Sequence, residues 1–303
     1  MTDLILSTLA QGLIFSIAGL GIYISFRILD FPDLSVDSTF TTGASISAIS
    51  IINGVNPFIS LVLSLFGGLI AGSITGILHV KFKITNILSG IIVMIGLYSV
   101  NLRIMGKSNL HLFDTIHIFS EKNHIYKLVF LIIFTLFLKV IIDFFFKTEI
   151  GYVLKAIGQN QKFITGMGFD VDRYKILGLA LANGLVALSG SLYTQYQGFS
   201  DISMGIGLIV SALASIVIGE MAFKNLKRFG VQNSSIVILG SIFYRGILSL
   251  ALQIGVEPSD LKLVTALLMV LILSKGIFNS SKEKIIKRRL NSDFIKRYIQ
   301  NFQ

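Results

Sequence analysis

The sequence predicts an all-α fold, a polytopic bundle with about 8–10 membrane-spanning helices. Of its 303 residues 53% are hydrophobic and only 14% are charged, whereas about a quarter of the residues of a soluble domain are charged. The mean hydropathy is +0.79. Apolar runs long enough to cross a bilayer recur along the chain. Such runs must be helical, because backbone polar groups find no water in the hydrocarbon.

The apolar runs appear in regular succession. They lie near 4–26, 36–54, 58–80, 84–103, 125–146, 176–197, 203–223, 232–255 and 259–277. This predicts about nine spans, a transmembrane domain over residues 1–277 and a basic tail over residues 278–303. Turn-forming residues at 30–33 and 54–57 separate the first three runs.

The basic residues set the expected orientation, since Lys and Arg accumulate in cytoplasmic connections. One side would carry Lys81, Lys83, the basic residues of 147–175 and 224–228, and the tail; the other side would carry Arg103, Lys107, Lys122, Lys127 and Lys262. We therefore expect a multi-pass protein of the bacterial inner membrane, with its C-terminus in the cytoplasm and its N-terminus outside. The net charge of +10 then reflects contact with membrane lipid and not with nucleic acid.

Several kinds of chemistry are excluded. The chain has no cysteine, and His79, His111, His117 and His124 show no metal-ligand spacing, so no metal site is expected. Gly106-Lys107-Ser108 resembles the end of a phosphate-binding loop, but Asn101 stands where that loop needs its first glycine. We expect this chain to bind no nucleotide and no other cofactor.

Small residues recur at every fourth position in two runs. They are Gly68, Gly72 and Gly76 in one run, and Ser211, Ser215 and Gly219 in the other. Stripes of this kind let helix backbones approach closely in a membrane, so they predict ordinary helix packing.

One short internal similarity accompanies the spans. Residues 31–35 (Phe-Pro-Asp-Leu-Ser) and 199–203 (Phe-Ser-Asp-Ile-Ser) each precede a span rich in small residues. In the expected topology these two spans run in opposite directions, as in an inverted repeat. A chance match of five residues is the competing interpretation.

We single out three ionisable residues within or at the ends of the spans, where a charge is costly unless it is paired or faces a cavity. Asp37 begins the second span, and its carboxylate suits the cap of a helix. Glu220 and Arg245 lie in the seventh and eighth spans and could form an interhelical ion pair. The alternative for all three residues is that they line a translocation path.

The connection at about 148–175 carries the most informative motif. It begins amphipathic, becomes polar, and contains Gly151, Lys155, Ala156, Gly158, Asn160 and Gly168 in the pattern Gly-x-x-x-Lys-Ala-x-Gly-x-Asn followed by Gly-Phe-Asp-Val. This pattern resembles the coupling-helix loop of permease subunits in the branched-chain amino acid and ribose ABC importer family. It departs from the family at Phe163 and Ile164, where small residues are usual. A plain solvated loop is the alternative interpretation.

The resemblance extends over most of the chain, through residues 101–109, 215–220 and 244–246. These stretches look like the subgroup associated with uptake of aromatic amino acids. The resemblance implies a cytoplasmic coupling helix that contacts a pair of ATP-binding subunits, which would bind the ATP. It further implies an extracytoplasmic substrate-binding protein, a second permease copy in a homodimer, and no catalysis by this chain.

Two other functions remain open to the sequence. An ion-coupled secondary transporter would need a carrier in the membrane, for which Asp37 and Glu220 are the candidates. An intramembrane enzyme would need a catalytic constellation that the spans lack. The outer connection 104–124 could dock a binding protein or serve only as a link, and the sequence does not identify the cargo.

Overall fold

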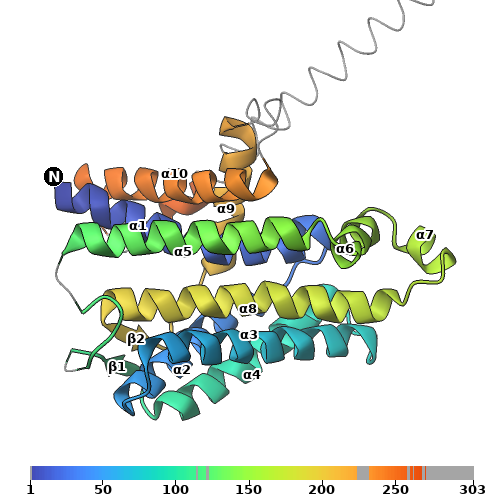
Figure 1. Cartoon of the computed structure of the whole chain (residues 1–303), viewed down its shortest axis with the longest axis horizontal. Coiled ribbons are helices and arrows are strands. Elements are labelled where there is room, and N and C mark those ends of the chain that lie inside the picture. Colours follow the sequence, from blue (N-terminus) through green and yellow to red (C-terminus); the bar gives the residue numbers. More distant parts are fainter. Residues whose placement is uncertain are drawn as a thin grey trace, which may run out of the picture.

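The chain folds into a bundle of long helices in the computed structural model (Figure 1). The structure describes residues 2–113, 115–120, 123–223, 232–257, 260–261, 263–267 and 270. The basic tail 278–303, the basic residues of 224–228 and most of the expected run 259–277 lie outside the described residues.

The described residues form the following elements. They are α1 Thr2–Ile22, η1 Tyr23–Ile28, α2 Val36–Ile52, α3 Pro57–Val80, α4 Asn86–Met105, β1 Asn109–His111, α5 His124–Phe145, α6 Glu149–Gln159, α7 Gln161–Gly166, α8 Val171–Gln197, β2 Phe199–Asp201, α9 Leu208–Ala222 and α10 Asn233–Gln253. The segment η1 is a single π-helical stretch that prolongs α1. The strands β1 and β2 pair antiparallel.

The expected membrane helix bundle is confirmed. Among the described residues, six helices are long and apolar enough to cross a membrane: α1 with η1, α3, α4, α5, α8 and α10. Two further expected runs form shorter helices, since α2 has 17 residues and α9 has 15. The helix α2 starts where its run was expected and ends at Ile52, whereas α9 starts at Leu208 because turns occupy residues 202–207.

The long helix α8 occupies the centre of the bundle. Within its most apolar window 72% of the residues are buried, compared with 22% for α4 and for α5. The helices α1, α2 and α3 pack around α8, so α4 and α5 form the periphery and present apolar side chains outward. These exposed side chains suit a lipid environment.

The stripes of small residues serve as helix contacts, as predicted. A side chain at Gly68 or Gly72 would clash with the backbone of α8, and one at Gly219 would clash with the carbonyl oxygen of Ile236 in α10. Glycine therefore permits the closest helix crossings in the bundle.

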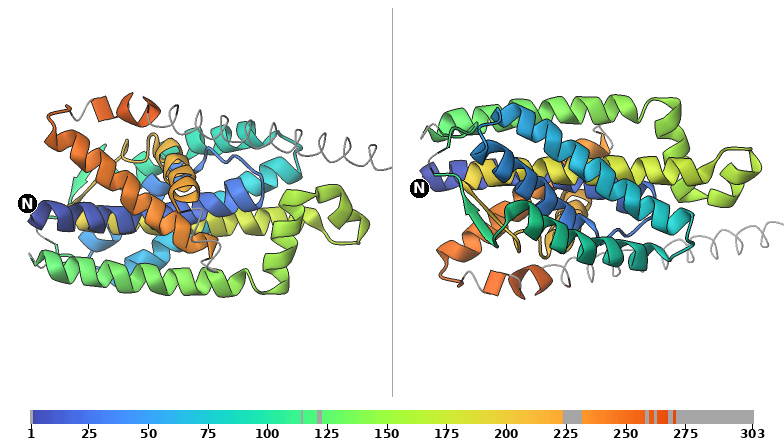
Figure 2. Two further views of the ribbon diagram at one scale, coloured as in Figure 1. Left: turned by 90° about the horizontal axis from the view of Figure 1, so that it is seen from above. Right: turned by 90° about the horizontal axis from the view of Figure 1, so that it is seen from below.

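The two ends of the bundle differ. Figures 1 and 2 show α6 and α7 beyond one end, which we call the α6–α7 end. The N-terminus and the strand pair lie at the opposite end, here called the β1–β2 end. The N-terminus and the 148–175 connection therefore lie on opposite sides, as the expected topology requires.

Candidate functional site

The helix α6 lies against the bundle through one face. Leu154 and Ile157 are 0% and 3% exposed and point inward, whereas Tyr152 on the other face is 60% exposed. The helix begins at Thr148, whose hydroxyl oxygen accepts a hydrogen bond from the backbone N–H of Gly151 at 3.4 Å. The amphipathic pattern of the sequence thus places a short helix across the end of the bundle.

Close backbone contacts hold α6 to its neighbours. A side chain at Gly158 would collide with the carbonyl oxygen of Ile28 at the end of η1, and one at Gly151 would collide with the last residues of α5. Gly158 is therefore a contact residue inside a helix and not a turn residue. A displacement of α6 must act directly on the end of α1.

Lys155 and Ala156 follow the same division of faces. The Nζ atom of Lys155 donates a hydrogen bond to the carbonyl oxygen of Phe146 at 3.0 Å, and it lies 5.0 Å from the ring centroid of Phe146. Ala156 packs beside the buried cluster of Ile157, Ile164 and Val171. The lysine thus ties α6 to the end of α5.

Asn160 separates α6 from α7. Its backbone N–H donates to the carbonyl oxygen of Ala156 at 2.9 Å, which closes α6. Its side-chain oxygen accepts from the backbone N–H of Phe163 at 3.1 Å, which caps α7. Gly168 then adopts a φ of +88°, a left-handed conformation that favours glycine and turns the chain toward α8.

The two positions that depart from the family pattern behave differently. Both residues belong to α7. Ile164 is 5% exposed and packs inward against Ile157 and Val171, whereas Phe163 is 62% exposed. Met167 is exposed as well. Tyr152, Phe163 and Met167 are thus exposed apolar side chains outside the membrane-spanning helices, and we call them the exposed apolar surface on α6 and α7.

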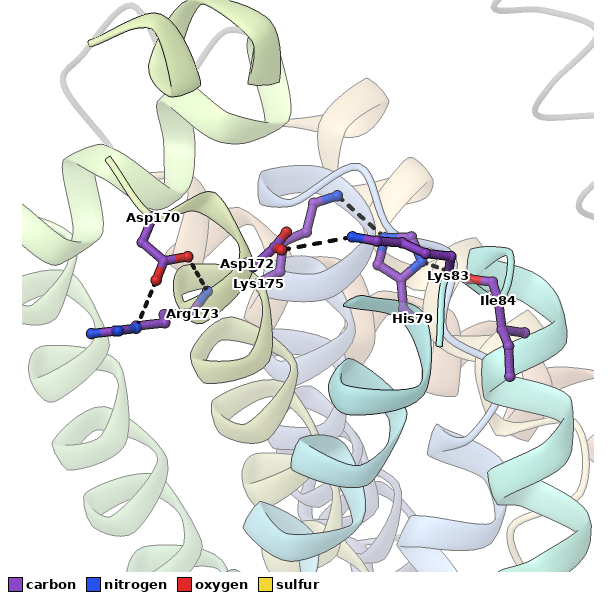
Figure 3. A network of polar contacts seen from close by, with 7 residues as sticks. All are labelled: His79, Lys83, Ile84, Asp170, Asp172, Arg173 and Lys175. Atoms are coloured by element: carbon purple, nitrogen blue, oxygen red, sulfur yellow. Dashed lines mark hydrogen bonds and ion pairs between the residues drawn. The ribbon is translucent and has the colours of Figure 1, made fainter. Parts of the chain in front are cut away.

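A polar network fixes the start of α8 beside this element (Figure 3). Lys83 lies 3.8 Å from Asp172, and the Nζ atom of Lys175 lies 3.2 Å from His79 Nε2. His79 Nδ1 lies 2.8 Å from the carbonyl oxygen of Ile84, so Nδ1–H donates and Nε2 accepts from the lysine. These contacts join the end of α3 and the connection that follows it to α8.

Two aspartate turns precede the short helices α2 and α9. The backbone N–H of Ser35 donates to Asp33 Oδ1 at 2.9 Å. In the same way, the backbone N–H of Ser203 donates to Asp201 Oδ1 at 2.8 Å. The two copies of the sequence similarity therefore share a local structure.

In both turns an asparagine side chain also donates a hydrogen bond to the second carboxylate oxygen of the aspartate. Asn183 Nδ2 donates to Asp33 Oδ2 at 2.7 Å, and Asn109 Nδ2 donates to Asp201 Oδ2 at 3.2 Å. The helices that follow run in opposite directions. The middle of α2 reaches Gln195, near the β1–β2 end, through Ser47, whereas α9 ends beside η1. The inverted-repeat interpretation is favoured over a chance match.

Asp37 caps a helix, although not its own. Its two carboxylate oxygens accept the backbone N–H groups of Gly207 at 2.8 Å and Ile209 at 2.9 Å. These groups begin α9, whose own N-cap residue Gly207 has no side chain to offer. Asp37 thus joins the starts of the two short helices inside the bundle.

The expected ion pair between Glu220 and Arg245 is wrong. Glu220 pairs with Arg27 of η1, and Arg27 Nε donates to Glu220 Oε1 at 3.1 Å. The cause is the helix crossing, because Gly219 packs on Ile236 in the first turn of α10. Arg245 lies nine residues further on, about 13 Å along the helix.

Arg245 instead packs on an aromatic ring. Its guanidinium carbon lies 3.5 Å from the ring centroid of Phe15 in α1, and Phe15 packs against Phe40 and Tyr193. The Nε atom of Arg245 is buried and has no hydrogen-bond partner among the described residues. No carboxylate among the described residues pairs with Arg245, although an unpaired charge inside a membrane bundle is costly.

The sequence matches the family described as branched-chain amino acid transport system / permease component over residues 4–273. The chain belongs to this family of ABC transporter permeases. A tyrosine transport system permease protein of Clostridioides difficile (strain R20291) is 46% identical over 92% of this chain and 94% of its own length. An uncharacterised protein of Rickettsia prowazekii (strain Madrid E) is 35% identical over 90% of this chain and 97% of its own length. The resemblance found in the sequence is confirmed.

Sequence reasoning missed several polar residues of the permease. Arg27 follows directly after the first apolar run, and Asp33 stands in the turn after it, so run length alone places both residues outside the spans. The structure buries Asp33 to 2% exposure and extends the first helix through Arg27. Asp143 interrupts the run Ile141-Ile142-Phe144, and this interruption was the available signal for a paired carboxylate.

Proposed function

We propose that this permease is the membrane subunit of an ATP-driven importer in which the α6–α7 element is the coupling element. The observation that carries the proposal is the seat of α6. Gly151, Lys155 and Gly158 hold this helix to the ends of α5 and α1, while Tyr152, Phe163 and Met167 expose apolar side chains on the outside. An element held in this way can convert the movement of a docked subunit into a tilt of the bundle.

The proposed assembly has two permease copies, a pair of ATP-binding subunits at the α6–α7 end and an extracytoplasmic binding protein at the β1–β2 end. The positive-inside distribution supports a cytoplasmic α6–α7 end and a cytoplasmic C-terminus. At the β1–β2 end Phe113 and Ile116 are 76% and 84% exposed, a suitable surface for a protein partner. ATP would be bound by the partner subunits, because this chain has no phosphate-binding loop.

The proposed cargo is an aromatic amino acid. The relative named for tyrosine transport supports this choice through its 46% identity over nearly the whole chain. Arg245 offers an unpaired cation for a carboxylate, and the neighbouring rings of Phe15, Phe40 and Tyr193 suit an aromatic side chain. We expect Arg245→Gln to lower the uptake of labelled tyrosine while the ATP-binding subunits stay bound. Unchanged uptake would remove Arg245 from the path.

An ion-coupled secondary transporter is the second candidate, and the geometry favours it less. Both oxygens of Asp37 cap α9, and both oxygens of Glu220 meet Arg27. Releasing either carboxylate for proton or cation transport would first break these contacts. We therefore assign Asp37 a structural role between α2 and α9, and Glu220 a structural role between α9 and η1.

Co-purification tests the proposed assembly. The tagged full chain is captured after co-expression with candidate ATP-binding subunits, as the wild type, as Phe163→Ser and as the control Phe113→Ser. The control removes an exposed phenylalanine from the opposite end. We expect the subunits to be retained by the wild type and by the control and to be depleted in Phe163→Ser. Equal capture by both variants would place the contact elsewhere, and no capture by the wild type would overturn the proposal.

A further inference from the structure

A cavity of about 600 Å³ lies at the α6–α7 end, between η1, α5, α6 and the start of α10. Three cationic side chains from different elements line it: Arg27, Lys147 and Lys155. Its wall also includes Tyr23 and Asn233. Tyr152, which belongs to the exposed apolar surface on α6 and α7, also borders this cavity, whereas Phe163 and Met167 do not line it.

Lys147 and Lys155 give this cavity a net positive charge, since Arg27 is already paired with Glu220. Asp143 is the acidic residue that lines it, and this carboxylate is already neutralised within the protein. Lys139 Nζ lies 2.8 Å from Asp143 Oδ2, and the hydroxyl of Ser234 donates to Oδ1. No described carboxylate pairs with Lys147, so this lysine is available to a ligand.

The lysine of α6 is held in place before any ligand arrives. Besides its hydrogen bond to the carbonyl oxygen of Phe146, Lys155 lies 5.5 Å from the ring centroid of Tyr152. Two of the five N–H groups of the Arg27 guanidinium donate to Glu220, so three remain for a ligand. The cavity thus combines fixed cations with spare N–H groups, an arrangement that suits a phosphate.

The cavity opens beside a lipid-facing surface. The helices α5 and α10 both pack on α1 and touch each other little, and Figures 1 and 2 show α1 between them. On α5, near the cavity, Ile141 and Phe144 are 47% and 71% exposed. The cations therefore lie where the membrane-spanning part of α5 ends, at the depth expected for lipid headgroups.

We propose that this cavity binds the phosphate headgroup of an anionic phospholipid, whose acyl chains lie along α1 between α5 and α10. The bound lipid bridges Lys147 of the α5 end, Lys155 of α6 and Arg27 of η1. It thereby stabilises the seat of α6 on the bundle, independently of which solute the permease carries.

Lipid titration of the purified full chain in detergent tests the proposal. The probes are short-chain phosphatidylglycerol, the matching phosphatidylcholine and free glycerol phosphate, and the readouts are retained adducts in native mass spectrometry and the melting temperature. We expect phosphatidylglycerol to bind most tightly and to raise the melting temperature. Lys147→Gln should weaken this binding about five-fold, since one such cation contributes roughly that factor.

Two further variants control the result. Lys81→Gln removes an exposed lysine outside the cavity and should bind as the wild type does, and Lys147→Arg should restore binding. Equal binding of both phospholipids, or equal loss in Lys147→Gln and Lys81→Gln, would overturn the proposal. Equal binding of glycerol phosphate would overturn the lipid assignment and indicate a site for soluble phosphates.

Discussion

The two aspartate turns before α2 and α9 share a sequence pattern and a local geometry but differ in their surroundings. Asp33 is 2% exposed inside the bundle and meets Asn183 of the central helix. Asp201 is partly exposed at the β1–β2 end and meets Asn109 of β1. The local hydrogen bond is therefore a property of the Asp-x-Ser sequence, whereas the contribution of each turn to the free energy of unfolding depends on its burial.

The surroundings also determine what each turn holds in place. The Asp33 turn fixes the chain directly after η1, the segment on which Gly158 of α6 rests. The Asp201 turn fixes the strand pair at the far end. Asp37 connects the two regions by capping α9. Substitutions at these three aspartates can thus separate local geometry from burial.

The largest effect is expected for Asp33→Ala. The change leaves the side-chain N–H of Asn183 and the backbone N–H of Ser35 buried without their acceptor. Removing one member of a buried polar pair costs about 3 kcal/mol or more. Thermal unfolding of the purified chain in detergent checks this expectation through a strongly lowered melting temperature.

Asn183→Ala supplies the matched control for that prediction. If Asp33 acts mainly through Asn183, the double variant should be scarcely less stable than Asp33→Ala alone. Additive losses would mean that the two side chains stabilise the bundle independently. Asp33→Asn should lose less than Asp33→Ala, because its side-chain oxygen can still accept from Ser35.

An intermediate effect is expected for Asp37→Ala. Loss of a helix cap costs about 1 to 2 kcal/mol, and here it frees the first N–H groups of α9. We expect a moderately lower melting temperature and reduced transport. Asp37→Asn keeps one acceptor oxygen and should fall between the wild type and Asp37→Ala. If Asp37→Asn transported normally, a proton-carrier role of Asp37 would be excluded as well.

The smallest effect is expected for Asp201→Ala, at under about 1 kcal/mol because the turn is partly exposed. Burial raises the pKa of the Asp201 carboxyl, but hydrogen bonds from Ser203 and Asn109 outweigh it and lower the pKa below its ordinary value. A carboxyl group whose pKa is lowered by folding stabilises the fold at pH values above its ordinary pKa. This stabilisation is lost as the pH falls through the lower pKa of the folded state. Melting curves of the wild type and Asp201→Ala should therefore converge only in strong acid. A constant difference at all pH values would contradict this account.

Much of the fold followed from local patterns. Hydrophobic run length predicted the long helices, and the amphipathic start of the 148–175 connection predicted the short helix α6. Partner choice across helices did not follow, because it depends on crossing geometry that no local pattern encodes. Glu220 meets Arg27 and not Arg245 because α9 crosses α10 near its start. Likewise, the sequence predicts Asp33 to be a loop residue, whereas the structure shows it hydrogen-bonded to Asn183.

The role of α6 as the coupling element is tested most directly by uptake of labelled tyrosine into vesicles that hold the permease with its ATP-binding subunits. The wild type is compared with Gly158→Ala, whose methyl group must push α6 away from Ile28. We predict uptake that requires ATP in the wild type, and a variant that keeps its ATP-binding subunits but loses most of the uptake. Normal uptake by Gly158→Ala, or uptake that follows an ion gradient without ATP, would contradict the account.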